Sequence, residues 1–396
     1  MNFRRFLILL VGISIPFNNV ALIPNVSLGL FAIAMYMLSM STYLSSVRKI
    51  STYYGKFVWN ILIFILFLSF INFLNQSIYN TPVFPFSIFM CFILMMVVLI
   101  HNICDDDALI YCIRGIALGG ILTSIFFALG IGITIDEGLR LRMFGENSNM
   151  LGIYMGLSSI VILYDIIISD GLNIKIFRFL FLFLFVPIVN LLFATASRTA
   201  FLIFALSIIV ILLLHPTKSF LRKAFLIIVG VTCSIFFLNK LEESNSVLSQ
   251  RLTTTIEEGN TSGRDNIVES LLPHVSESPI WGYGQTGYVD VSKKALGKTS
   301  TIGGVIYGFS PHNVIIELLL YTGVIGLLLW IILWWKIGKR SWLLFRKRKL
   351  LLPILMCIPM FACIISGQLI TAKWSYILYA YIISEYYNQE QLQKLQ

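Results

Sequence analysis

The sequence predicts an all-α polytopic membrane protein, because apolar residues dominate it and charged residues are scarce. Of its 396 residues, 58% are hydrophobic and 12% are charged, and the mean hydropathy is +0.86. Soluble globular domains carry about 25% charged residues. A transmembrane helix needs about 20 mostly apolar residues, and about twelve segments of this chain approach that requirement. Composition and segment length together exclude a soluble domain.

The predicted spans follow one another along the chain with one long polar interruption. The first lies behind Arg4 and Arg5 and breaks at Pro16, so it also resembles a signal peptide. Because so many spans follow it, we interpret it as an uncleaved signal anchor. The full set of predicted spans is 6–24, 27–46, 57–74, 85–101, 109–133, 150–168, 179–194, 200–214, 225–238, 313–335, 350–370 and 374–388.

The polar interruption defines the domain organisation. Residues 239–312 are too many for a simple connector and predict a small, partly helical domain between spans 9 and 10. The expected domains are therefore 1–238 with spans 1 to 9, the loop domain 239–312, and 313–396 with spans 10 to 12 and a cytoplasmic tail.

The net charge of +10 is explained by membrane topology. Counting Lys and Arg by alternating sides puts 19 on one side and 10 on the other, with six of the 10 in the long loop. Cytoplasmic loops carry the excess of basic residues, and long loops are discounted. We therefore expect both termini in the cytoplasm and residues 239–312 on the outer face. A nucleic-acid partner is not expected.

Neither a metal nor a cofactor is predicted from the chemistry of the side chains. The six cysteines lie scattered in apolar stretches, without a CxxC motif or a Cys/His pair at metal-ligand spacing. We expect them to be reduced structural thiols. The sequence also lacks the GxxxxGK[ST] motif, which argues against nucleotide hydrolysis as an energy source.

Arginines on the outer face predict a site for an anion. Arg142, Arg198 and Arg264 lie on the side where arginine is disfavoured, although interfacial snorkelling is the alternative for each. Spans 6, 8 and 10 begin on the same face, and their N-termini carry unpaired N–H groups and a positive dipole end. Arginines and helix N-termini both bind phosphates, so we expect a diphosphate ligand. The expected helix caps are Asn149, Ser197 or Thr199, and Ser310 followed by Pro311.

His312 is the outward-facing histidine at a helix start and is the candidate proton acceptor. The helix dipole and nearby arginines both disfavour the imidazolium form, so the side chain should be neutral near pH 7. The alternative is an interfacial histidine that only forms hydrogen bonds. Asn313 follows it, and Glu317 lies four residues later on the same helix face, where we expect it to pair with an arginine.

The loop domain also contains glycines interleaved with aromatic residues at 281–288. Trp281 and Tyr283 offer flat apolar faces that could pack against sugar rings. Anchoring at the membrane interface explains the same aromatic residues equally well. This stretch by itself does not decide between the two.

Taken in order, these motifs resemble those of the O-antigen ligase/polymerase superfamily. Each motif alone is weak, but the ordered set from about residue 140 to 330 is fairly specific. Two departures are Ser148 before Asn149, where the family often has proline, and Ile267 with Val268, where a tryptophan is common. The motifs are Arg142 with FGENSNMLG at 144–152, SRTA at 197–200, Gly263-Arg264, SPIWGYG at 278–284, and PHN at 311–313 with Glu317 and GVIG at 323–326.

The resemblance implies a metal-independent enzyme similar to type C glycosyltransferases. Such enzymes take a glycan from an undecaprenyl-diphosphate-linked oligosaccharide on the outer face of the bacterial cytoplasmic (inner) membrane. By position, Arg198 and Arg264 would bind the diphosphate with Arg142 as a third ligand. His312 would be the base or would position the acceptor. A chain-length regulator and a flippase are further candidate partners.

The acceptor is not specified by the sequence. Another carrier-linked repeat unit would make the enzyme an O-antigen polymerase, lipid A-core would make it an O-antigen ligase, and a protein acceptor an oligosaccharyltransferase. We favour the polymerase, because such enzymes are many and varied. A transporter of lipid-linked sugars is the alternative from another class, but carriers usually place their sites near the midplane on interrupted helices and often show internal repeats.

Overall fold

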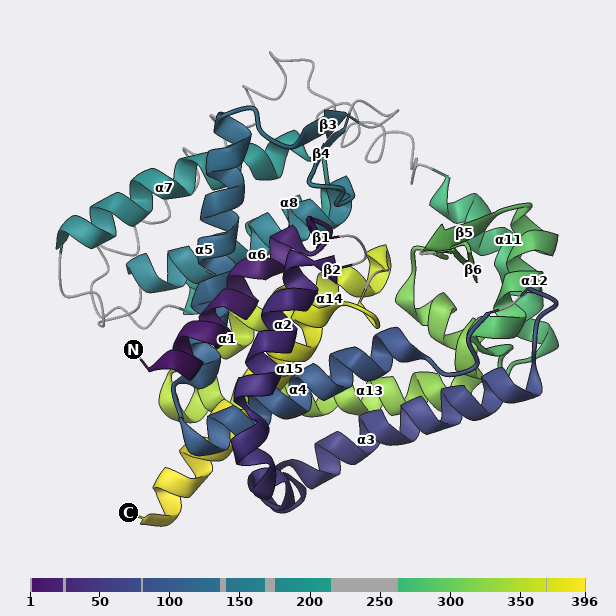
Figure 1. Cartoon of the computed structure of the whole chain (residues 1–396), viewed down its shortest axis with the longest axis horizontal. Helices are drawn as coiled ribbons and strands as arrows, with labels where there is room; N and C mark the ends of the chain where they lie inside the picture. The colour runs from purple at the N-terminus through teal and green to yellow at the C-terminus, as the bar shows by residue number, and fades with distance from the viewer. Residues whose placement is uncertain are drawn as a thin grey trace. The chain divides into compact units, whose positions relative to one another are not determined.

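The computed structural model describes residues 2–23, 26–79, 81–135, 140–167, 175–214, 263–302, 304–367 and 369–395, and these are mostly helical (Figure 1). The chain divides into two compact units, each assembled from separate stretches of sequence. Unit 1 comprises Met1–Thr42, Asp105–Asn260 and Ser341–Pro359, and unit 2 comprises Tyr43–Cys104, Thr261–Arg340 and Met360–Gln396.

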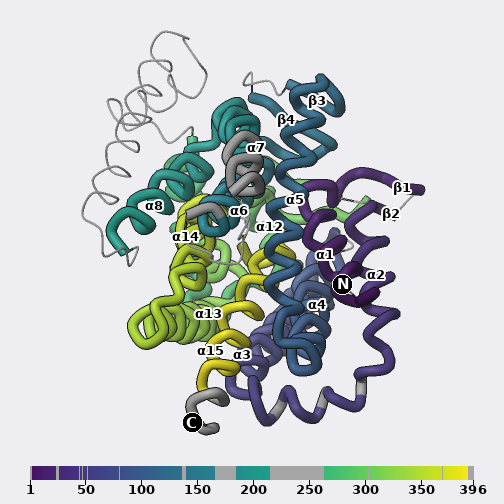
Figure 2. The backbone as a smooth tube through the Cα atoms, turned by 90° about the vertical axis from the view of Figure 1, so that its left-hand side faces the viewer, coloured from purple at the N-terminus to yellow at the C-terminus, as the bar shows by residue number. Residues whose placement is uncertain are grey.

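Unit 1 holds the first helices, the strand that contains Arg142 and the helix that begins at Arg198. Figure 2 traces α5, α6 and α8, and α6 packs against the other two. Its elements are α1 (Phe3–Ser14), a 3-10 turn (Ile15–Phe17), the hairpin β1 (Ala21–Ile23) and β2 (Val26–Ser27), α2 (Leu28–Ser39), α5 (Ala108–Ala128), the hairpin β3 (Ile133–Ile135) and β4 (Leu141–Met143), α6 (Ser148–Ile167), α7 (Lys175–Ala194) and α8 (Arg198–Leu214).

Helices α1 and α5 are joined by a close backbone contact and an ion pair. A Cβ atom added to Gly12 would lie 2.8 Å from the Cα atom of Gly115, so the two helices approach closely. Small residues permit such contacts between membrane helices. Arg5 binds Asp105 through two hydrogen bonds of 2.6 Å. The start of the chain is therefore fixed to the start of α5.

Unit 2 holds residues 263–312 of the predicted loop domain, which are called the loop domain below, and the helices around them. The elements are α3 (Val47–Leu74), α4 (Phe86–Cys104), α11 (Arg264–Glu277), α12 (Gly284–Leu296), the antiparallel hairpin β5 (Thr299–Ile302) and β6 (Val305–Gly308), α13 (Val314–Arg348), α14 (Leu352–Ser366) and α15 (Lys373–Leu395). A 3-10 segment, Ser41–Ser46, precedes α3, and α13 and α14 each cross the division between the units.

A described helix overlaps every predicted span except 225–238, which lies outside the described residues. The predicted end of the first span is wrong: α1 ends at Ser14 rather than near residue 24. Pro16 follows in the 3-10 turn, and proline removes a helical donor and clashes with the preceding turn.

Several of these helices are apolar enough for a membrane protein. Among the described residues, four have the length and composition of a span: Thr52–Leu74, Phe86–Cys104, Ala108–Ala128 and Val314–Arg348. Shorter apolar helices are Leu28–Ser39, Leu184–Ala194, Arg198–Leu214 and Leu352–Ser366. The fold is therefore that of a helical membrane protein, and the number of twelve spans stays a prediction.

Helix α13 is broken at Gly323, which has φ 59° and ψ −160°. In an unbroken helix the Val324 N–H would donate to the Leu320 carbonyl. Here the Val324 N–H donates to the Pro279 carbonyl (2.8 Å), and the Leu320 carbonyl accepts from the Tyr283 N–H (2.7 Å). The segment 279–283 thus provides new partners for both the donor and the acceptor of the lost helical hydrogen bond.

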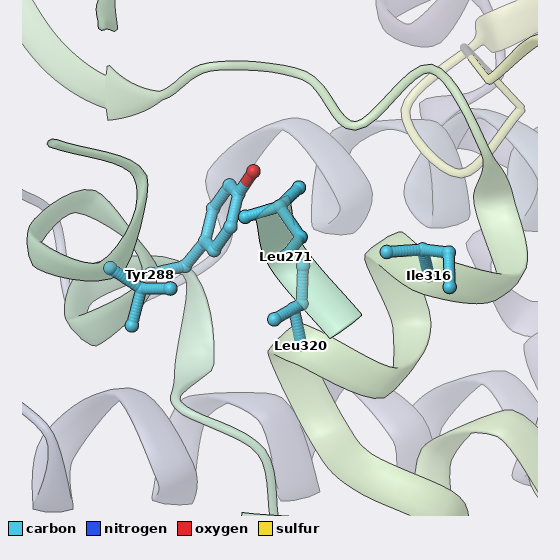
Figure 3. Packing of buried hydrophobic residues seen from close by; sticks show 5 residues of the cluster. Leu271, Tyr288, Ile316 and Leu320 are labelled. Carbon is cyan, nitrogen blue, oxygen red and sulfur yellow. The ribbon is translucent and has the colours of Figure 1, made fainter. Parts of the chain in front are cut away.

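The first part of α13, residues 314–322, packs into the loop domain. Tyr288 of α12 and Leu271 of α11 face the first turns of α13 in Figure 3. The buried cluster consists of Leu271, Tyr288, Val291, Ile316 and Leu320. The loop domain therefore has its own hydrophobic core, which includes the start of α13.

Asn72, near the C-terminal end of α3, connects this domain to the first half of the chain. It is fully buried, and its side-chain oxygen accepts from the Gln285 N–H at 2.6 Å. Its amide donates to the Val83 carbonyl, and the Thr286 hydroxyl donates to the Asn72 carbonyl. One buried amide thus holds the start of α12 against the α3–α4 connection.

Gly282→Ala should destabilise the protein more than Gly297→Ala. Both glycines have positive φ, which costs alanine about 1–2 kcal/mol. A Cβ at Gly282 would also lie 2.7 Å from the backbone nitrogens of Thr322 and Gly323, whereas Gly297 has open space. Overpacking adds about 1–3 kcal/mol. Thermal unfolding of the full chain in detergent checks this, and equal losses in the two variants would contradict the insertion of 279–283 into α13.

Candidate functional site

In unit 1 the starts of α6 and α8 lie next to each other. A Cβ on Gly152, in the first turns of α6, would lie 2.8 Å from the Cβ atoms of Ser197 and Ala200. Arg198 is the first residue of α8. The two helix N-termini therefore lie at the same end of this unit, as the anion-site hypothesis requires.

Arg142 and Asn149 flank the start of α6. Arg142 lies in β4 opposite Thr134 of β3, a few residues before the helix. The Arg140 guanidinium donates to the Asn149 side-chain oxygen at 2.7 Å. Arg142, Asn149 and Arg198 are thus brought to the adjoining helix starts of unit 1, and Arg140 joins them.

The caps of these helices differ partly from the expected ones. Ser197 caps α8 as predicted, because its hydroxyl accepts from the Ala200 N–H. Asn149 is wrong as a cap: the Asn147 side chain accepts from the Met150 N–H, so the helix starts earlier. The prediction missed Asn147, which satisfies the same capping rule two residues earlier.

In unit 2, Arg264 and His312 come from segments far apart in sequence. Arg264 is the first residue of α11, after Gly263 with φ 76°. Burial, together with the positive charge of Arg264, lowers the pKa of His312 below its ordinary value. Burial and the charge of Arg264 therefore both favour the neutral form of His312 that the sequence predicts.

His312 has an unusual backbone conformation that its neighbours hold. Its φ of 52° is left-handed, which is uncommon for residues other than glycine. The ring packs edge-on against Phe309 at 5.7 Å. The Tyr288 hydroxyl donates to the Phe309 carbonyl (2.6 Å), and the Ser292 hydroxyl accepts from the Phe309 N–H (2.8 Å). Tyr288 and Ser292, both buried, therefore support the loop before His312.

Asn313 caps α13, and the expected cap at Ser310 and Pro311 is wrong. The Asn313 side chain accepts from the N–H groups of Ile315 and Ile316. Ser310 instead accepts from the His312 N–H at 3.3 Å. The left-handed backbone at His312 prevents the helix from starting before it.

Glu317 lies one turn into α13, on the part that packs into the loop domain. The hydroxyl of Tyr321, one turn later, is within hydrogen-bonding reach of its carboxylate. Among the described residues of unit 2, no arginine forms an ion pair with Glu317. The polar group that faces it is therefore a tyrosine of its own helix.

The side chains of Trp281 and Tyr283 lie in different surroundings. Trp281 is half exposed and packs against Phe67 of the apolar helix α3, with ring centroids 5.8 Å apart. The Tyr283 hydroxyl donates to Glu277 (3.0 Å), which also contacts His274 Nδ1 (2.9 Å). Burial and the facing Glu277 carboxylate raise the pKa of Tyr283 to about 12.

The sequence analysis missed the residues that support the candidate site. Asn72, Tyr288 and Ser292 act through hydrogen bonds to backbone groups of distant segments, and no spacing rule reveals such partners. No group of three or more His, Cys, Asp or Glu side chains within the described part of the chain could hold a metal ion. The cysteines that the structure describes are free thiols.

A known protein family matches the part of the chain that contains most of these candidate residues. Residues 182–331 match the family model described as O-antigen ligase. This match supports the resemblance to the O-antigen ligase/polymerase superfamily. No curated protein matches the chain. Arg142 and Asn149 precede the matched segment, which contains Arg198, Arg264, Trp281, Tyr283, His312, Asn313 and Glu317.

The pKa of His312 predicts how its reactivity changes with pH. Diethyl pyrocarbonate modifies neutral imidazole, so modification of His312 should rise with pH with a midpoint below the ordinary value of 6.5. Arg264→Gln removes a positive charge that disfavours the imidazolium, so the midpoint should move to higher pH. Mass spectrometry of the peptide containing His312 measures this. The control is Lys294→Gln, an exposed charge on α12; an equal shift in the control would contradict the role of Arg264.

Proposed function

We propose that the protein is a membrane glycosyltransferase that transfers a glycan from an undecaprenyl-diphosphate-linked donor, acting as an O-antigen polymerase. The family match supports a lipid-linked donor and a glycan acceptor. The single observation that carries the proposal is the pairing of a neutral, strained His312 with the cation Arg264 in one unit. A base and an anion ligand are the two groups that this reaction needs.

Arg264 binds and stabilises the diphosphate of the donor. The guanidinium presents a planar set of donors that matches phosphate oxygens, and its charge offsets the charge that develops on the leaving group. Arg198 and Arg142, at the paired helix starts of unit 1, are proposed as further diphosphate ligands. The N–H groups at these helix starts contribute in the same sense.

His312 accepts the proton of the acceptor hydroxyl. The hydroxyl oxygen forms a bond to the anomeric carbon of the donor sugar while the bond from that carbon to the diphosphate oxygen breaks. The electron pair leaves with the diphosphate, and the proton passes to the imidazole. Attack opposite to the leaving group inverts the anomeric configuration. Asn313 and Glu317, on the first turn after His312, and Tyr283 and Trp281 are the candidates for contacts with sugar.

The alternatives differ in the acceptor or in the class of protein. Lipid A-core or a protein as acceptor would make the same chemistry a ligase or an oligosaccharyltransferase. A transporter of lipid-linked sugars is the alternative from another class. Proteoliposomes loaded with donor separate it from an enzyme, because an enzyme forms glycan-linked product without net movement of the lipid.

Arg264→Ala and Arg198→Ala should each lower turnover about 10²-fold or more, because each loses electrostatic stabilisation of the leaving group. His312→Ala should lower it by a similar factor through loss of the base. The measurement is transfer from a lipid-diphosphate oligosaccharide by purified protein. Lys294→Ala, which removes an exposed charge on α12, is the matched control. Full activity of both arginine variants would refute this mechanism.

A deletion strain distinguishes polymerase from ligase. If the protein is a polymerase, the surface polysaccharide ladder should disappear and a single repeat unit should remain. Long carrier-linked chains that accumulate without surface polymer would instead identify a ligase. Wild-type protein should restore the ladder and His312→Ala should not. An unchanged ladder in the deletion strain would rule out a role in the main surface glycan.

A further inference from the structure

The turn between α14 and α15 touches the backbone of His312. Gly367, just after α14, has φ 77°, and a Cβ atom there would lie 3.1 Å from His312 Cα and 3.3 Å from its carbonyl carbon. Such contacts are tighter than real Cβ atoms usually make, so glycine allows the close approach. A segment that belongs to none of the sequence motifs thus lies against the candidate base.

Ser366, the last residue of α14, has a buried hydroxyl whose role its own helix does not explain. The residue is 5% exposed, and its Oγ atom has no hydrogen-bond partner among the described residues. The thiol of Cys363 is within hydrogen-bonding reach of this hydroxyl, but thiols are weak hydrogen-bonding groups and do not replace a full partner. Buried polar groups in native proteins nearly always have a partner, so this hydroxyl calls for an explanation.

His312 has a buried atom of the same kind. Its Nδ1 atom lacks a hydrogen-bond partner within the described part of the chain. The next residue after Ser366 is in contact with the backbone of His312. Two buried polar atoms without hydrogen-bond partners, Ser366 Oγ and His312 Nδ1, therefore belong to residues that adjoin the contact between Gly367 and the His312 backbone.

Residues 369–372, just before α15, are held against that helix. The Ser375 hydroxyl, on the first turn of α15, contacts the Leu369 and Ala372 carbonyls at 2.9 and 2.8 Å. The Tyr376 hydroxyl donates to the Ile370 carbonyl at 3.0 Å. Because both hydroxyl groups are buried, residues 369–372 are fixed relative to α15. Ser366, at the end of α14, comes shortly before this segment in the sequence.

We propose that Ser366 positions His312 for proton transfer, with its hydroxyl oxygen accepting a hydrogen bond from the Nδ1–H of the imidazole. This inference rests on the proposed function. A neutral imidazole carries its proton on one nitrogen, so a partner for Nδ1–H leaves the lone pair on Nε2 free to accept the proton of the acceptor hydroxyl. The two side chains are not bonded to each other in this structure. Hydrogen bonds between catalytic groups often shorten only when substrate binds.

The same hydrogen bond acts after the proton has moved. Both nitrogens of an imidazolium are donors, and the Nδ1–H then binds a hydroxyl oxygen that faces it. Ser366 therefore favours both the reactive tautomer and the charged product. The hydroxyl proton of Ser366 takes no part in the reaction and remains available to another hydrogen-bond acceptor.

The test measures kcat and KM for donor and acceptor with full-length protein. Ser366→Ala should lower kcat about 10-fold or more, the scale of partners that orient a functional histidine, and should leave both KM values unchanged. Ser366→Thr keeps the hydroxyl and should restore most of the rate. The matched control is Ser384→Ala, a serine of α15 that is 2% exposed and whose hydroxyl donates to the Tyr381 carbonyl.

The outcomes separate this inference from the proposed function. If wild-type protein transfers glycan and Ser366→Ala keeps its kcat, Ser366 does not position His312 although the proposed function stands. A rise in the acceptor KM at unchanged kcat would assign Ser366 to acceptor binding and overturn the inference. If the Thr variant fails to fold, as judged by its melting temperature, the kcat and KM values of Ser366→Ala decide alone. If wild-type protein forms no product, the proposed function itself fails.

Discussion

The break in α13 at Gly323 is the constraint on which the position of the loop domain in unit 2 depends. A backbone N–H or carbonyl without a partner is costly near the membrane interior, so a broken helix persists only where other groups replace its hydrogen bonds. The segment 279–283 supplies both replacements, through Pro279 and Tyr283. The residues before the break are thereby released from the long helix and join the loop domain. His312 lies at the start of this short piece, so the break determines where the candidate base can be.

A second feature is backbone strain at the helix starts. Left-handed backbone occurs at Phe144 before α6, at Ala196 before α8 and at His312 before α13. Such strain persists only where the surroundings enforce it, and it is concentrated at functional sites. The Phe144 ring packs against Phe17 and Phe126, and the α14–α15 turn packs against His312. Left-handed backbone thus precedes all three helices with the proposed anion-facing ends, and it also occurs at Lys349 before α14.

The sequence predicted the helices well and the contacts between distant segments poorly. Apolar runs show where helices lie, because burial in lipid requires them, and the motifs identified the superfamily. Helix starts were less accurate, since Asn147 and Asn313 compete with Asn149 and Ser310 under the same capping rule. Ser366 could not be predicted, because one buried serine forms no pattern. Its relevance depends on a backbone contact made after the chain has folded.

The break in α13 also bears on the choice between enzyme and carrier. Carriers use interrupted helices to expose backbone groups and dipole ends to a substrate near the midplane. In this protein the Val324 N–H and the Leu320 carbonyl, which the break separates, are both paired with the 279–283 segment. These groups are therefore unavailable to a transported ion or sugar. The interruption serves to attach the loop domain and to set the start of α13, which is the arrangement that an enzyme with a fixed base requires.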